Sequence, residues 1–77
     1  MNKETVTKTN LQKRIEDLKA FIKYNQKVRN QTETLLNEID VNSISKEQLE
    51  HLINKINTCE SLVELYQREI QDLEGLM

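Results

Sequence analysis

Apolar residues recur every three or four positions through both halves of the chain, and a short polar segment separates the halves. In the first half they are Leu11, Ile15, Leu18, Ile22, Val28, Leu35, Leu36 and Ile39. In the second half the spacing is unbroken, at Leu49, Leu52, Ile56, Cys59, Val63, Tyr66, Ile70, Leu73 and Met77. This spacing places apolar side chains on one face of a helix, and about four heptads in register are typical of a coiled coil. The sequence therefore predicts two long amphipathic helices.

Capping signals set the expected boundaries of these helices. Thr9 with Gln12 fits a capping box, and so does Ser45 with Gln48. Between the helices, Asp, Asn and Ser side chains favour a turn because they compete for backbone hydrogen bonds. We expect a flexible tail over residues 1–8, a first helix over about 9–39, a turn at 40–44 and a second helix over about 45–75. Residues 9–77 then form a single domain.

The two halves carry opposite charge. Residues 1–30 hold eight basic side chains against three acidic ones, whereas residues 31–77 hold three basic against ten acidic. Folding the chain back near residue 42 lays the basic half along the acidic half, which favours antiparallel pairing. The overall charge of -2 is too balanced to indicate a nucleic-acid-binding protein.

Antiparallel pairing also matches apolar residues across the fold. Positions whose residue numbers sum to 84 or 85 lie opposite each other on the two helices, and these include the pairs 15/70, 18/66, 22/63 and 36/49. We therefore predict an all-α fold, an antiparallel helical hairpin that is a two-helix coiled coil. An alternative is one long parallel coiled coil between two chains without the reversal, although it would place like charges together.

One seam between two helices does not use all the apolar residues. Those left on the flanks are Phe21, Tyr24, Val28, Leu35, Leu62, Leu65 and Leu76. Contiguous exposed apolar surface of this kind marks an interface. We expect these seven residues to bind a protein partner and complete a helical bundle, either in a homodimer or with helices of another protein.

Polar residues interrupt the middle of the seam. Asn25 is expected to face Cys59, and Arg29 to face Ile56. Polar seam residues lower stability but fix register and partner choice, so Asn25, Arg29 and Cys59 are candidate specificity residues. Arg29 can reach Glu60, a carboxylate of a partner, or water at the seam edge.

The sequence offers no arrangement suited to catalysis. His51 is the single histidine, and Glu47 one turn earlier leaves any metal site without a third ligand. Cys59 lies on the seam, where cysteine usually acts as a small apolar residue. We expect no enzyme activity, no metal, no cofactor and no small-molecule substrate. Lys19, Lys23 and Lys27 form a stripe that can contact a polyanion, but aromatic residues are not interleaved with it.

Size and targeting cues limit the setting in which the chain acts. Chains of roughly 70–80 residues seldom obtain more than about 3–5 kcal/mol from one core, so a partner is expected for these 77 residues. The lone cysteine allows no internal disulfide. The first ten residues lack the apolar stretch of a signal peptide, and the longest apolar run is too short to span a bilayer. We expect a soluble, intracellular (cytoplasmic) protein.

Three families share features with this sequence. The hairpin with a short Asp-containing turn resembles the plasmid copy-number RNA-binding protein Rop, a homodimeric four-helix bundle. The segment Glu47-Gln48-Leu49-Glu50-His51-Leu52-Ile53-Asn54 resembles the signature of small sporulation-type response-regulator phosphatases, with Glu50 where that family has aspartate. Size and architecture are similar to hairpin co-chaperones of type III secretion needle subunits.

The leading hypothesis is a non-enzymatic protein-interaction module, a small coiled-coil subunit, adaptor, chaperone or regulator. Its alternative is a Rop-like nucleic-acid-binding dimer that uses the lysine stripe. The resemblance to response-regulator phosphatases implies a third, remoter role.

Overall fold

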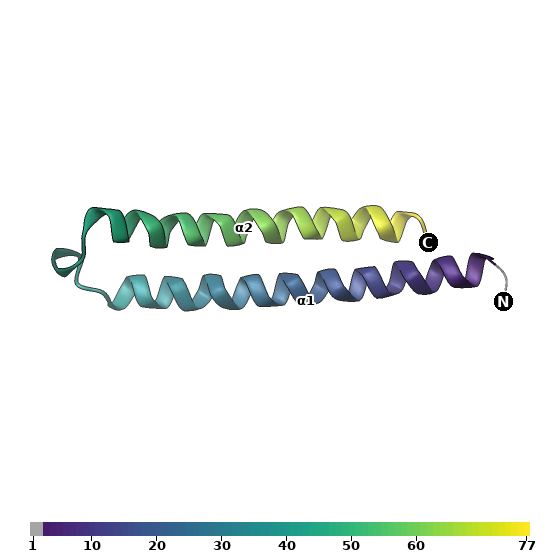
Figure 1. Ribbon diagram of the computed structural model, residues 1–77, viewed down its shortest axis with the longest axis horizontal. Coiled ribbons are helices and arrows are strands. Elements are labelled where there is room, and N and C mark those ends of the chain that lie inside the picture. The colour runs from purple at the N-terminus through teal and green to yellow at the C-terminus, as the bar shows by residue number, and fades with distance from the viewer. Residues whose placement is uncertain (1–2) are drawn as a thin grey trace.

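The chain folds into two long antiparallel helices joined by a tight turn (Figure 1). The computed structural model describes the backbone of residues 3–77 and the side chains of residues 8–40 and 42–77. Helix α1 spans Lys3–Glu38, the short 3-10 helix η1 spans Val41–Ser43, and α2 spans Lys46–Gly75. The hairpin measures 63 × 15 × 14 Å. The prediction of an all-α helical hairpin is confirmed, and the parallel coiled coil without a reversal is wrong.

Asp40 organises the reversal of the chain. Its side chain accepts a hydrogen bond from the Asn42 backbone N–H at 3.0 Å, and its carbonyl accepts from the Ser43 backbone N–H at 2.9 Å and hydroxyl at 2.8 Å. These bonds pair donors of the turn that have no partner within a helix, as expected for a short polar residue in a turn. The turn therefore falls within the predicted segment.

Ser45 begins α2 with a complete capping box. The Gln48 backbone N–H donates to Ser45 Oγ at 3.1 Å, and the Ser45 backbone N–H donates to Gln48 Oε1 at 3.2 Å. Two amides that the first turn leaves unsatisfied are thus paired reciprocally. The start of α2 predicted from the sequence is confirmed.

Helix α1 begins earlier than the sequence analysis indicated. It continues through Thr9 and Asn10 and starts at Lys3, so the predicted start near Thr9 is wrong. The physical reason is that no proline or glycine precedes Thr9, so nothing in the backbone forces the helix to begin there. Residues 1–2 lie outside the described part of the chain, and the flexibility of residues 1–8 stays a prediction. The first turns of α1 extend beyond the end of α2 (Figure 1).

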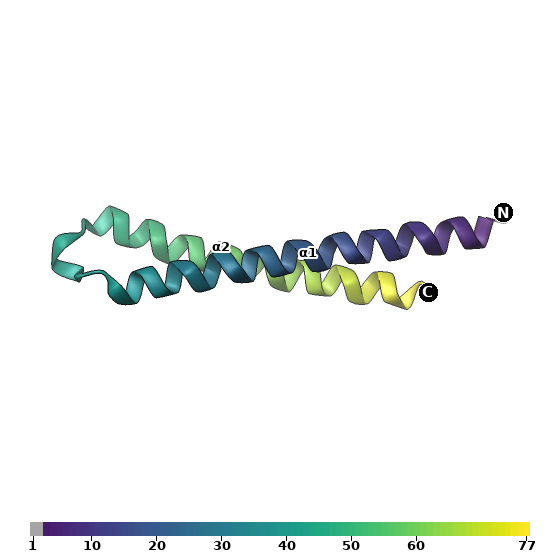
Figure 2. The same ribbon diagram turned by 90° about the horizontal axis from the view of Figure 1, so that it is seen from below.

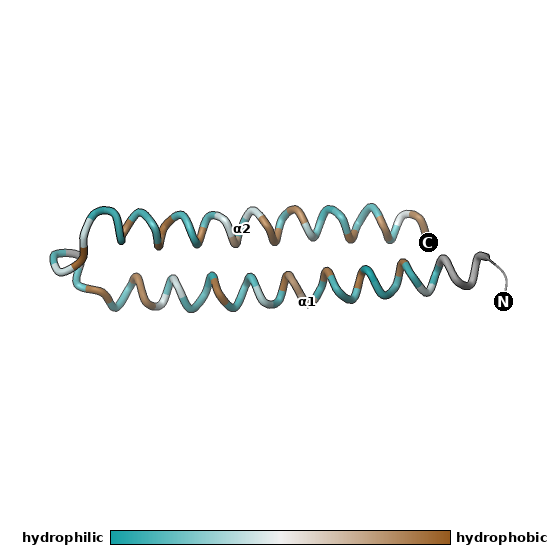
Figure 3. Tube along the Cα trace, viewed as in Figure 1, coloured by the Kyte–Doolittle hydropathy of each residue, from teal (hydrophilic) through white to brown (hydrophobic). Residues whose placement is uncertain are grey.

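The seam is most tightly packed with apolar side chains near the chain ends. Leu18 is fully buried and forms a cluster with Ile15 and Ile70, against which Tyr66 and Ile22 pack. This cluster contains both members of the predicted pairs 15/70 and 18/66. Apolar segments of the two helices face each other in Figure 3, and Figure 2 shows that the helices cross at a shallow angle.

Candidate functional site

The hairpin has two long flanks, and an ion pair identifies the residues that share one of them. One row on α1, at seven-residue spacing, contains Arg14, Phe21, Val28 and Leu35. The corresponding row on α2 contains Lys55, Leu62, Glu69 and Leu76. Arg14 Nη2 lies 3.2 Å from Glu69 Oε1, so the two rows border the same side of the seam. Because both rows repeat every heptad and the helices are antiparallel, moving one heptad along each row places Phe21 beside Leu62.

All seven residues predicted to bind a partner therefore lie on one side of the hairpin. Tyr24 and Leu65 come three residues after Phe21 and Leu62, so they lie one row further out on that side. We call this surface the apolar face; it comprises Phe21, Tyr24, Val28, Leu35, Leu62, Leu65 and Leu76. Three of its members are well exposed, with Tyr24 at 65%, Leu65 at 56% and Leu76 at 72%.

The centre of the apolar face is partly anchored to the seam. The ring of Phe21 lies 5.8 Å from that of Tyr66, with the planes tilted by 38°. Phe21 and Leu35 are each 48% exposed, whereas Val28 and Leu62 are half-buried. Such tilted ring pairs hold both side chains in defined positions. The contact with Tyr66 thus holds Phe21 against the seam.

Two shallow hollows flank Leu62 on α2. One is lined by Asn25, His51, Asn54, Lys55, Thr58, Cys59 and Leu62. The other is lined by Asn54, Asn57, Thr58, Ser61, Leu62 and Leu65. Hollows of this kind can receive side chains from a second helical surface.

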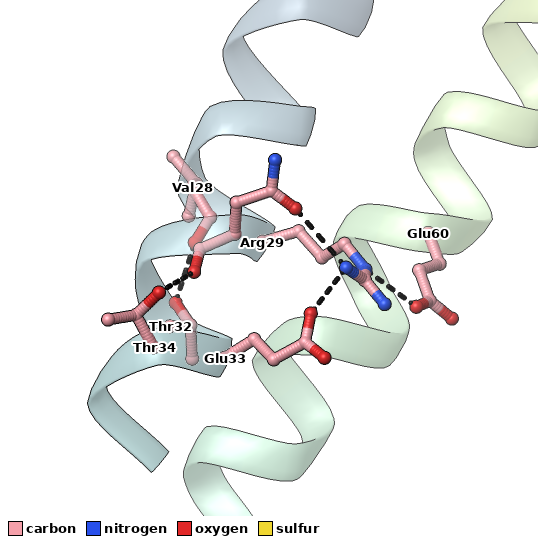
Figure 4. A network of polar contacts seen from close by, with 7 residues as sticks. Val28, Arg29, Thr32, Glu33, Thr34 and Glu60 are labelled. Atoms are coloured by element: carbon pink, nitrogen blue, oxygen red, sulfur yellow. Dashed lines mark hydrogen bonds and ion pairs between the residues drawn. The ribbon is translucent and has the colours of Figure 1, made fainter. Parts of the chain in front are cut away.

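The opposite flank is polar and centres on Arg29 (Figure 4). Arg29 Nε donates to Glu60 Oε1 across the seam at 2.8 Å, and Nη1 donates to Glu33 of its own helix and to Asn30 Oδ1 at 3.2 Å. The hydrogen bond to Glu60 and the charge of Glu33 raise the pKa of Arg29 above its usual value. The guanidinium therefore stays charged and ties α1 to α2. We call this surface, with Arg29, Glu33 and Glu60, the polar face.

Two further polar residues of α1, Asn25 and Thr32, form hydrogen bonds within their own helix. Asn25 Nδ2 donates to the Phe21 carbonyl at 2.8 Å, and Thr32 Oγ1 donates to the Val28 carbonyl at 2.8 Å. Cys59 is buried with a free thiol. Bonds of this kind let polar residues sit in a seam without a partner on the other helix. A role for Asn25 and Cys59 in specificity stays a prediction.

The lysine stripe does not share a face with the apolar residues. Lys19 lies in the same heptad row as Glu33, at the edge of the polar face, and Lys23 and Lys27 continue around the outside of α1. All three are exposed. The stripe thus winds around the helix, because a four-residue step exceeds one helical turn of 3.6 residues.

A larger hollow lies at the bend of the hairpin. It has a volume of about 700 Å³ and is lined by Ile39, Ser43, Ile44, Ser45, Glu47, Gln48, His51 and Leu52. His51 and Glu47 are exposed at this end. Within the described residues, no group of three or more His, Cys, Asp or Glu side chains is placed to hold a metal ion.

Comparison with known proteins gives no match. No protein-family model matches the sequence, and no match is found among curated proteins or solved structures. Over residues 3–77, neither helix contains a stretch long and apolar enough to cross a membrane. The candidate site is therefore defined by its own geometry alone.

Two elements of the site were missed by the sequence analysis. One is the Arg14–Glu69 ion pair. The residue numbers of this pair sum to 83, which is close to the sums of 84 and 85 for residues that lie opposite each other. The other is Glu33, four residues after Arg29, a spacing at which opposite charges meet on a helix. Both signals were present in the sequence and needed only the register of the hairpin to be interpreted.

Proposed function

We propose that this chain is a non-enzymatic protein-interaction module that binds a helical partner through the apolar face. It acts as a small coiled-coil subunit, adaptor, chaperone or regulator inside the cell. The observation that carries the proposal is the gathering of seven apolar side chains on one flank, whereas the other flank carries the Arg29 cluster and, of the exposed large apolar side chains, Ile53. Randomly scattered apolar side chains would be divided more evenly between the two flanks.

The energetics of the hairpin support this role. The described residues with a buried apolar side chain are Ile15, Leu18, Cys59 and Ile70. A core this small leaves a chain of this length marginally stable. Covering the apolar face removes additional apolar surface from water, and each Å² buried contributes about 25 cal/mol of stabilisation. A partner that binds only the folded hairpin therefore also stabilises its fold.

Affinity capture from cells that make this protein tests the proposal. A tagged native chain should retain a protein, either another copy or a different helical protein, that the double variant Leu62→Asp/Leu65→Asp loses. The matched control Gln67→Asp/Gln71→Asp adds the same two charges at exposed positions away from the apolar face and should retain it. Leu65→Asp alone, at a side chain 56% exposed, serves if the double variant unfolds. Equal retention by all variants would overturn the proposal.

The second candidate function is binding of a nucleic acid through Lys19, Lys23 and Lys27. The exposure of all three side chains favours it. Contacts with phosphates release counterions, so the binding constant should fall steeply as salt rises. The variant in which all three lysines are replaced by Gln should lose that binding. Lack of retention on RNA or DNA at low salt would remove this candidate.

A further inference from the structure

The apolar face repeats the same spacing on both helices. On α1, Tyr24, Val28 and Leu35 follow Phe21 by three, seven and fourteen residues. On α2, Leu65, Glu69 and Leu76 follow Leu62 at the same intervals. Since the helices are antiparallel, one series runs from the Phe21–Leu62 level toward the bend and the other toward the chain ends. The apolar residues therefore form a diagonal stripe with an approximate two-fold axis normal to the face.

A stripe with this symmetry is complementary to a second copy of itself. We infer that two hairpins associate through their apolar faces, with their bends at opposite ends, so that residues 21–35 of one copy pack on residues 62–76 of the other. This arrangement rests on the proposed role of the apolar face and specifies its occupant. Leu35 of one copy then meets Leu76 of its partner at each end of the stripe.

Charge decides the relative orientation of the two copies. Within the stripe, residues 62–76 carry Glu69 in the heptad row of Leu62 and Asp72 in that of Leu65, whereas the corresponding two rows of residues 21–35 carry no charged side chain. With the bends at opposite ends, these carboxylates face the uncharged rows of the second copy. With the bends at the same end, residues 62–76 would face the same segment of the second copy and bring like charges together, at an interaxial distance of about 8–10 Å, which is within the Debye length.

The dimensions of the stripe suit a modest but specific interface. From the level of Leu35 to that of Leu76 it extends about 42 Å, at ~1.5 Å per residue. Across a hairpin 15 Å wide, the projected area approaches the size of standard interfaces, which bury about 800 Å² per partner. Glu69 interrupts the row on α2, but its carboxylate is already paired with Arg14. The stripe therefore brings no unpaired charge from this row into the interface.

Pulsed electron paramagnetic resonance on spin-labelled full-length chain tests the arrangement. Cys59→Ala removes the native thiol, and Asn42→Cys places one label at the exposed bend. Asn42 lies twenty-one residues beyond Phe21, so bends at opposite ends should be about 60 Å apart, whereas bends at the same end should be about 20 Å apart. Circular dichroism confirms that the labelled chain stays helical, and adding Leu62→Asp/Leu65→Asp should abolish the intermolecular signal.

The three outcomes separate this inference from the proposed function. A distance near 60 Å supports it. A distance near 20 Å shows a dimer whose orientation the charges do not set, which overturns it. No intermolecular signal in the helical chain shows that a second copy is not the occupant, which also overturns it. In that last case the capture experiment still decides whether the apolar face binds a different protein.

Discussion

Leu18 is the residue whose truncation should damage the hairpin most. Its side chain is 0% exposed and lies in the cluster with Ile15 and Ile70, onto which Tyr66 packs. Replacing it by alanine removes three carbon atoms from the best-packed part of the seam. The neighbouring Ile15 and Ile70 are themselves buried between the two helices, so they refill the space only in part.

The cost follows from the size of the missing group. At about 0.8 kcal/mol per buried methylene, the lost transfer free energy is roughly 2.4 kcal/mol, and the residual cavity raises the total toward about 3–5 kcal/mol. A small single core supplies about 3–5 kcal/mol in all. Leu18→Ala should therefore unfold most of the chain in dilute solution.

Far-ultraviolet circular dichroism without urea measures the folded fraction of the Leu18→Ala chain, and urea titration gives the free energy of unfolding of the native chain and of a control, all at one chain concentration because association adds to the apparent stability. Ile53→Ala is the matched control, since it also removes three carbons but from a side chain 41% exposed on the polar flank. It should lower the free energy of unfolding by about 1 kcal/mol. If Leu18→Ala costs no more than Ile53→Ala, the assignment of the core is wrong.

Three further substitutions test local interactions. Ser45→Ala removes the cap of α2 and should lower the free energy of unfolding by about 1 kcal/mol in urea titrations, whereas Ser61→Ala in the exposed middle of the same helix should not. Thr32→Val, at a side chain 5% exposed and bonded only to its own helix, should leave unfolding within about 1 kcal/mol of native or raise it; a larger loss would contradict this. Arg29→Gln should lower the melting temperature more at low salt than at high salt, while Arg68→Gln, whose exposed pair with Glu64 spans 3.9 Å, should leave it unchanged.

The backbone arrangement could be predicted because its causes are local. The seam follows from the spacing of apolar residues, and the start of α2 follows from Ser45 and Gln48, which need only each other. The start of α1 was predicted too late because Thr9 and Gln12 form a capping pattern, whereas the helix continues through both residues. A capping pattern fixes a helix start only where the preceding residues resist helix formation.

The candidate site was predicted less completely because it depends on register between helices. Phe21, Leu62 and Leu65 were identified as flank residues, but their location on one side follows from the Arg14–Glu69 ion pair. The reach of Arg29 to Glu60 was one of several outcomes open to a long side chain, and the sequence alone did not choose among them. Such choices depend on which groups the fold brings within reach.

The solution mass of the native chain, beside that of Leu62→Asp/Leu65→Asp, tests most directly whether the apolar face is the interface. Light scattering over a wide range of concentrations should give the native chain a mass that rises toward twice that of the 9.1 kDa chain. The variant should stay at the monomer mass while remaining helical. Equal masses for the native chain and the variant at every concentration would contradict association of two copies through the apolar face.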